Sequence, residues 1–141
     1  MKIGICAPST PFTREDADRV TALTAASHTD VELVFDPQCF TENGHFAGTD
    51  RQRLTAFVDL ANDPGIDAIW FVRGGYGACR IAESAVEGLK DVARRKLYMG
   101  YSDQGNLLGC LQRHGFPHLA HGPMPADIRR AGGDAAVIRA L

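Results

Sequence analysis

The chain has few of the residue patterns that mark whole classes of protein. Its 141 residues include only four cysteines, with no C-x-x-C pair and no paired histidine spacing. We therefore expect reduced thiols rather than a disulfide framework or a zinc site, and predict no metal and no cofactor. No apolar run approaches the roughly 18 residues that a membrane-spanning helix needs, so no membrane partner is expected.

An excess of charge of one sign is also missing. Lysine and arginine total 15 against 17 aspartate and glutamate residues, which gives a formal net charge of −2. The densest basic stretch, "ARRK" (93–96), is predicted to be a solvated helix end, so no nucleic-acid partner is expected. The N-terminal segment is broken by Pro8 too early for a signal peptide, and we expect the protein in the cytoplasm.

Nucleotide-binding fingerprints are incomplete. A dinucleotide site needs its glycines after the first strand, where this chain has "APSTP" (7–11). Asp36 ends the second predicted strand, as a ribose-binding acid would, but without those glycines it is an isolated match. A P-loop is excluded because no G-K-[ST] follows "RGGYG" (73–77). Nucleotide binding is therefore the weaker interpretation of that segment.

The chain does contain alternating buried strands and amphipathic helices. Continuous apolar runs predict strands covered on both faces, at 2–7, 31–35, 67–72 and 96–101, with a fifth before His121. Cap signals and helical periodicity predict helices at 13–27, 49–62, 79–88 and 105–113. This order predicts an α/β fold with a doubly wound, mostly parallel sheet. The tail at 126–141 is helical in pattern, with a break at Gly132 and Gly133.

Two unusual segments follow strands at the carboxyl edge of that sheet, where open α/β sheets bind ligands. "RGGYG" follows the third strand, and its exposed amides could form an oxyanion hole or serve only a tight turn. "GYSDQG" (100–105) follows the fourth and resembles the G-x-S-x-G elbow, in which a strained turn exposes a serine. Ser102 is therefore a candidate nucleophile, with an ordinary helix N-cap as the alternative.

A serine nucleophile needs a base, usually a histidine oriented by a carboxylate. Of the five histidines, His28 and His114 lie near helix ends and are predicted to be solvated. Only His121 lies at the same sheet edge, as a substrate contact or a structural hydrogen-bonding group. The residues by themselves therefore indicate no complete serine–histidine–acid set.

Five segments occur in the order and spacing of a known family: "APS" (7–9), "FAGTDRQR" (46–53), "RGGYGACRI" (73–81), "GYSD" (100–103) and "HGPM" (121–124). Together they resemble the serine LD-carboxypeptidases, or muramoyl-tetrapeptide carboxypeptidases, a group that includes the microcin C self-immunity peptidases. The resemblance implies a flavodoxin-like three-layer α/β/α domain over 1–141. It also implies a C-terminal domain, absent from this chain, that carries the catalytic glutamate and histidine. The uncapped apolar end at Leu141 likewise leads us to expect that the natural chain continues.

The resemblance also implies roles for single residues. Ser102 is the expected nucleophile, and the amides of Asp103 and Gly75 are expected to line the oxyanion hole. The expected substrate contacts are Arg73, Gly74, Tyr76 and His121.

The chain departs from the family directly after the serine. Gln104 and Gly105 stand where the family usually has an aliphatic residue followed by threonine or serine. This departure bears on the helix start behind the nucleophile and on substrate fit.

The implied activity is cofactor-free hydrolysis of the L,D-amide that releases terminal D-alanine from murein tetrapeptides, as in peptidoglycan recycling. One alternative is a microcin-immunity-type peptidase that cleaves an aminoacyl-nucleotide amide. Another is a non-catalytic domain that binds a small ligand. The expected partners are a murein-derived peptide and the missing C-terminal domain, and the surface left exposed without that domain predicts a homodimer.

Overall fold

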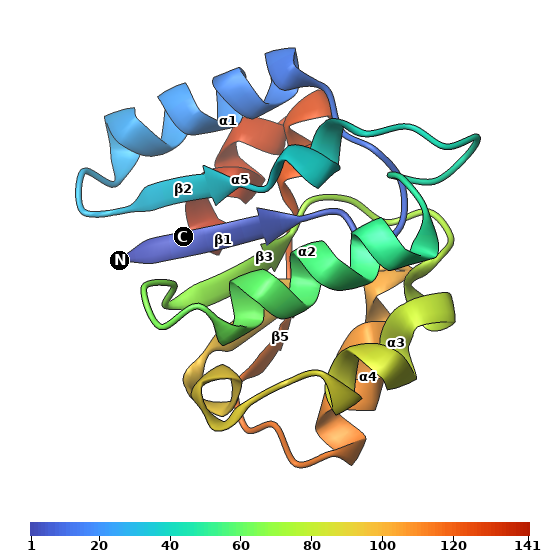
Figure 1. Cartoon of the computed structure of the whole chain (residues 1–141). Coiled ribbons are helices and arrows are strands. Elements are labelled where there is room, and N and C mark those ends of the chain that lie inside the picture. The colour runs from blue at the N-terminus through green and yellow to red at the C-terminus, as the bar shows by residue number, and fades with distance from the viewer.

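Five short parallel strands form the centre of the molecule, which a computed structural model describes over all 141 residues (Figure 1). The strands are β1 (Lys2–Cys6), β2 (Glu32–Phe35), β3 (Ala68–Phe71), β4 (Leu97–Gly100) and β5 (Leu119–His121). They lie in the order β2-β1-β3-β4-β5, and each neighbouring pair is parallel. The predicted α/β fold with a doubly wound parallel sheet is confirmed.

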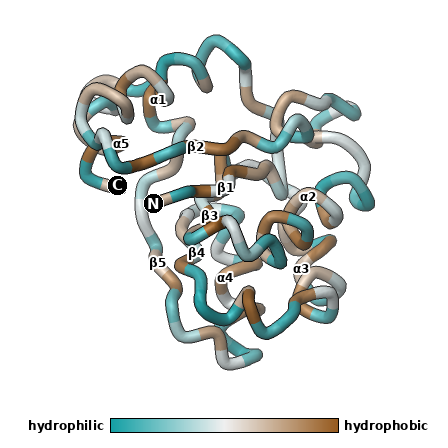
Figure 2. The backbone as a smooth tube through the Cα atoms, turned by 60° about the vertical axis from the view of Figure 1, so that its left-hand side comes forward, coloured by the Kyte–Doolittle hydropathy of each residue, from teal (hydrophilic) through white to brown (hydrophobic).

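Five α-helices cover the two faces of this sheet: α1 (Arg14–Ser27), α2 (Asp50–Asn62), α3 (Ala78–Glu87), α4 (Gln104–Arg113) and α5 (Gly133–Ala140). The residues of β3 alternate between the faces. Ile69 and Phe71 enter the core beneath α2, α3 and α4, whereas Trp70 enters the core beneath α1 and α5. Figure 2 shows hydrophobic residues along the central strands and at intervals along the helices. Burial on both faces explains the continuous apolar runs.

The first two helices begin where their cap signals predict. The Thr13 hydroxyl accepts a hydrogen bond from the backbone N–H of Asp16 at 3.2 Å. Thr49 and Gln52 form a complete capping box at the start of α2. Each cap satisfies backbone donors that the first helical turn leaves without partners, so local sequence determines where these helices begin.

Two residues predicted to be solvated are instead engaged in the fold. Lys96 is 3% exposed and follows a 3₁₀ turn, Asp91–Arg95, rather than an α-helix end. Its ammonium group donates hydrogen bonds to the backbone carbonyls of Asp63 (2.6 Å) and Ile66, and burial lowers the pKa of the side chain. His28 is half-buried, with Nε2 at 3.1 Å from the carbonyl oxygen of Ile138 in α5. Those solvation predictions are wrong because the fold brings backbone carbonyls within hydrogen-bonding distance of both side chains.

The tail after β5 crosses back to the face of the sheet that α1 covers (Figure 1). A 3₁₀ turn, Pro125–Arg129, precedes Gly132, whose φ of +73° separates that turn from α5, as the glycine pair predicted. Val137 is fully buried in the core beneath α1, and Leu141 packs against that core. No helix has both the length and the apolar character needed to cross a membrane.

Candidate active site

Ser102 occupies a strained corner between β4 and α4. Its φ is +58°, and it is the one residue other than glycine with a positive φ. Side chains other than glycine rarely adopt this region because it costs of order 1 kcal/mol or more. The N-cap of α4 is Asp103, and no side chain caps the helix, so Ser102 is not the cap. The serine is exposed, and its strain is the geometry that a nucleophile elbow requires.

The carboxylate of Asp103 holds this corner in place. Its Oδ2 accepts hydrogen bonds from the Ser9 hydroxyl (2.5 Å) and from the backbone N–H of Ala78 (2.9 Å), while Asn106 donates to Oδ1 at 3.0 Å. Ala78 is the first residue of α3, whose own N-cap, Gly77, offers no side chain. Asp103 therefore caps α3 from a separate loop, and its negative charge lies at the positive end of that helix.

Gln104 connects the serine corner to the glycine-rich segment. Its side chain is fully buried, and Nε2 donates to the Ser9 hydroxyl and to the backbone carbonyl of Arg73, both at 2.8 Å. Its Oε1 has no partner. Gln104 thus adds a hydrogen-bonded link where the family usually has an aliphatic side chain. Gly105, the second departure, faces open space, so the substitution costs no packing there.

The glycine-rich segment lies directly against the serine. A Cβ on Gly74 would lie 2.9 Å from Ser102 Oγ, which leaves no room for a side chain. Gly75 has a φ of +117°, and a Cβ there would lie 2.4 Å from Thr10 Cγ2. The backbone amides of Gly75 and Asp103 donate no hydrogen bond within the chain. Two free N–H groups beside one exposed hydroxyl are the components of an oxyanion hole.

Ser102 opens into a cavity of about 270 Å³. The lining residues are Arg73, Gly74, Gly75, Tyr101, Ser102, Met124, Ala126, Asp127, Arg129 and Arg130. They include no histidine and no glutamate, so this chain brings no such base to the serine. Three arginines and one aspartate make the lining positive.

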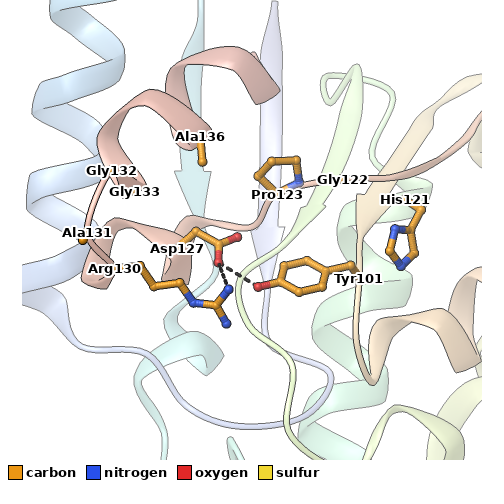
Figure 3. A pocket seen from close by; sticks show the side chains of 10 residues that line it. All are labelled: Tyr101, His121, Gly122, Pro123, Asp127, Arg130, Ala131, Gly132, Gly133 and Ala136. Carbon is orange, nitrogen blue, oxygen red and sulfur yellow. Dashed lines mark hydrogen bonds and ion pairs between the residues drawn. The ribbon is translucent and has the colours of Figure 1, made fainter.

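The structure brings only two of the four predicted substrate contacts to this cavity, Arg73 and Gly74. His121 is exposed and lines a neighbouring cavity of about 370 Å³, which shares Tyr101, Asp127 and Arg130 with the Ser102 cavity. Figure 3 shows His121 beside the Tyr101 ring. The His121 and Tyr101 rings meet edge to face, with centroids 6.0 Å apart. Tyr76 is 51% exposed and packs beside Phe46, at 6.1 Å between ring centroids, outside both cavities. Contacts by His121 and Tyr76 with a substrate at Ser102 remain predictions.

The sequence analysis predicted no role for Arg53, whose side chain forms a hydrogen bond with the glycine-rich segment. Arg53 is fully buried, and its Nη1 donates to the carbonyls of Pro8 (2.6 Å) and Gly77 (3.0 Å). Asp50 forms an ion pair with it. A signal was available, because Arg53 precedes the buried Phe57 by four residues and therefore lies on the apolar face of α2. An arginine on a core-facing stripe indicates buried carbonyl or carboxylate partners.

Comparison with known proteins identifies the family. A family model described as the LD-carboxypeptidase N-terminal domain matches residues 3–122. The chain therefore belongs to the LD-carboxypeptidase family, as its five sequence segments predicted. Residues 123–141, which supply five of the ten lining residues of the Ser102 cavity, lie outside that match.

Individual relatives agree with this assignment. The murein tetrapeptide carboxypeptidase of Pseudomonas aeruginosa is 36% identical over 84 residues, which cover 60% of this chain and 27% of that protein. A crystal structure of the muramoyltetrapeptide carboxypeptidase of Oxalobacter formigenes has a TM-score of 0.72 at 24% identity, and the match covers 89% of this chain and 40% of that one. The wild-type microcin C7 self-immunity protein has a TM-score of 0.74 at 22% identity, over 96% of this chain and 41% of that one. The two structures establish the fold, and the chain spans well under half of each relative's length.

Proposed function

We propose that this chain is the nucleophile-bearing part of a serine LD-carboxypeptidase that releases terminal D-alanine from murein-derived tetrapeptides. The observation that carries the proposal is the strained, exposed Ser102, which caps no helix and lies beside two free backbone amides. The murein tetrapeptide carboxypeptidase of P. aeruginosa, 36% identical over the matched residues, supports this choice of substrate.

In the proposed reaction, Ser102 Oγ attacks the carbonyl carbon of the amide that joins an L-centre to D-alanine. The amides of Asp103 and Gly75 stabilise the negative charge that develops on the carbonyl oxygen. The serine proton passes through a base to the departing amine, so D-alanine leaves and an ester remains on Ser102. Water then hydrolyses the ester. The base is a glutamate–histidine pair in a second domain, and we expect this chain alone to be inactive.

A second candidate is a peptidase of the microcin-immunity type, which would cleave the amide of an aminoacyl-nucleotide conjugate. The observation in its favour is the TM-score of 0.74 to the microcin C7 self-immunity protein, comparable to the 0.72 for the muramoyltetrapeptide carboxypeptidase. The product distinguishes the two, because one reaction releases D-alanine and the other an aminoacyl-nucleotide fragment.

The test is hydrolysis of a murein tetrapeptide by the protein joined to its second domain, with D-alanine release measured by amino-acid analysis. Ser102→Ala is expected to lower kcat by about 10³-fold or more, because the nucleophile itself is lost. Ser84→Ala is the matched control, since Ser84 is an exposed serine of α3 outside the cavity and its loss should leave the rate unchanged. Undiminished D-alanine release by the Ser102 variant would contradict the proposal, because another group would then be the nucleophile. No D-alanine release by the unaltered two-domain protein would favour a domain that only binds its ligand.

A further inference from the structure

The Ser102 cavity carries more positive charge than the chain neutralises. Of its three arginines, Arg129 pairs with Asp16, with Nε to Oδ2 at 2.6 Å, and Arg130 pairs with Asp127 at 3.3 Å. Arg73 pairs with no carboxylate. Its hydrogen bond to the chain runs from Nη1 to the Pro11 carbonyl at 3.3 Å, so most of its five N–H donors stay free.

Arg73 also faces a like charge. Partial burial, and then the neighbouring Arg129 guanidinium, lower the pKa of Arg73. The Asp16 carboxylate pairs directly with Arg129 and acts on Arg73 only from a distance, so it offsets the charge of the two guanidinium groups only in part. The positive charge that remains raises the free energy of the empty site, and a bound anion relieves this cost. The planar fork of a guanidinium matches the two oxygens of a carboxylate, which it binds through parallel hydrogen bonds.

The other two arginines differ from Arg73 in having a carboxylate partner. Figure 3 shows the Asp127 carboxylate between the Tyr101 hydroxyl, which donates to it at 2.7 Å, and the Arg130 guanidinium. Arg129 lies over the Phe12 ring, with the guanidinium carbon 5.0 Å from the ring centroid, and forms an ion pair with Asp16. Arg129 and Arg130 are therefore each paired with a carboxylate, while Arg73 keeps free donors for a ligand.

The position of Arg73 relative to the nucleophile selects which anion fits. Arg73 immediately precedes Gly74, whose Cα lies against the Ser102 hydroxyl. In a peptide whose penultimate carbonyl is attacked, the terminal carboxylate follows one residue later, at most about 3.6 Å along the chain. A carboxylate one residue beyond the scissile bond therefore lies within the same cavity.

We propose that Arg73, with Arg129 beside it, binds the free carboxylate of the substrate's terminal residue, which restricts cleavage to the release of a single C-terminal residue. The inference rests on the proposed function, and it adds the group that anchors the substrate. It assigns a ligand-binding role to Arg129, which lies outside the residues matched to the family.

The first experiment measures binding to this chain, which requires no catalytic base. N-acetyl-D-alanine and N-acetyl-D-alaninamide are titrated separately, and the backbone amide signals of Gly74 and Gly75 are followed by NMR. The carboxylate compound is expected to bind about tenfold or more tightly than the amide, and Arg73→Met should abolish this preference. Arg51→Met is the matched control, because Arg51 is an exposed arginine of α2 outside the cavity and its variant should keep the full preference.

Equal affinity for the two compounds, or a preference that survives Arg73→Met, overturns the inference. Should Arg73→Met fail to fold, Arg73→Lys and Arg129→Met keep the test decisive. Lysine retains the positive charge but lacks the planar guanidinium, so Arg73→Lys should give an intermediate preference for the carboxylate compound. Arg129→Met should weaken carboxylate binding. An unchanged preference in both folded variants contradicts the proposal.

A second experiment separates this inference from the proposed function. With the second domain present, the tetrapeptide and its C-terminal amide are compared as substrates. Cleavage releases D-alanine from the tetrapeptide and D-alaninamide from its amide. Hydrolysis that needs Ser102 but prefers the tetrapeptide to its amide by the same factor with and without Arg73 leaves the proposed function intact and removes the carboxylate anchor. Selective carboxylate binding without any D-alanine release keeps the anchor and removes the peptidase.

Discussion

The helices of this domain begin in two different ways. Helices α1 and α2 start at threonines that cap them locally, whereas α3 and α4 start at Gly77 and Asp103 with no side-chain cap within their own segment. No residue of the locally capped helices lines the Ser102 cavity, whereas α3 and α4 begin shortly after residues that line it. The candidate site lies where helices begin without a local cap, because such a helix start leaves backbone N–H groups free for a ligand or for a distant side chain.

The largest effect is expected on removing the distant cap of α3. Asp103→Ala should lower the free energy of unfolding by about 3 kcal/mol, since a partly buried carboxylate that accepts several hydrogen bonds is lost. Urea denaturation measures the change. Asp134→Ala, which removes an acidic residue from the first turn of α5, is the control for the general effect of negative charge near a helix start and should cost well under 1 kcal/mol. Equal losses in both variants would show that Asp103 does not link the loops.

The same substitution at two glycines distinguishes a backbone position that requires glycine from one that does not. Gly75→Ala places a Cβ 2.4 Å from Thr10 Cγ2 at a φ of +117°, and should destabilise the protein by about 2 kcal/mol or more. Gly105→Ala meets no atom within 4 Å inside α4 and should stabilise by about 0.5–1 kcal/mol, through helix propensity alone. Thermal unfolding of both variants should therefore shift in opposite directions, and shifts of the same sign would contradict the proposed difference.

The local cap of α2 should be worth less than the distant cap of α3. Thr49→Ala removes the capping box with Gln52 and should cost about 1 kcal/mol of unfolding free energy. Thr55→Ala makes the same chemical change at an exposed position within the same helix and should be neutral or slightly stabilising. A Thr49 variant that loses as much stability as Asp103→Ala would remove the distinction between the two kinds of helix start.

The smallest effect concerns pH. The hydrogen bond from Arg80, and then the charges of Arg53 and Arg80, hold the pKa of Asp50 below its ordinary value. Because the folded state favours the charged form, Asp50 contributes stability above its unfolded pKa of about 4, and this contribution is lost as the pH falls further. Denaturation midpoints between pH 5 and pH 3 should fall less steeply in Asp50→Asn than in the unaltered protein. Asp59→Asn, an exposed carboxylate of the same helix, should leave the slope unchanged.

Several parts of the molecule could be predicted because their signals are local. The buried strands, the two capped helices and the glycine break before α5 all follow from side-chain pattern or backbone preference within a few residues. The order of the segments also placed "RGGYG" and "GYSD" at neighbouring strand ends, since parallel strands present their carboxyl ends at one edge. The structure confirms that these two segments meet, with Gly74 against Ser102.

Other parts depended on contacts between residues far apart in the chain. The pairing of Ser9 with Asp103 spans 94 residues, and that of His28 with Ile138 spans 110. No periodicity encodes such pairs, which is why Lys96 and His28 were wrongly expected in solvent. Likewise, His121 lines the neighbouring cavity and not the Ser102 cavity, and the sequence pattern does not indicate where that side chain lies.

The sequence alone determined the α/β class, the position of the serine at a strand-to-helix corner and the family to which the chain belongs. Only the tertiary structure decided that Ser102 is strained rather than a cap, that Asp103 caps α3, and that Arg73 shares a cavity with Arg129 and Arg130. The physical reason is the distance along the chain over which each effect acts. Propensity and patterning act over one or two helical turns, whereas a free amide, a paired charge or a cavity exists only after distant segments have packed and excluded water.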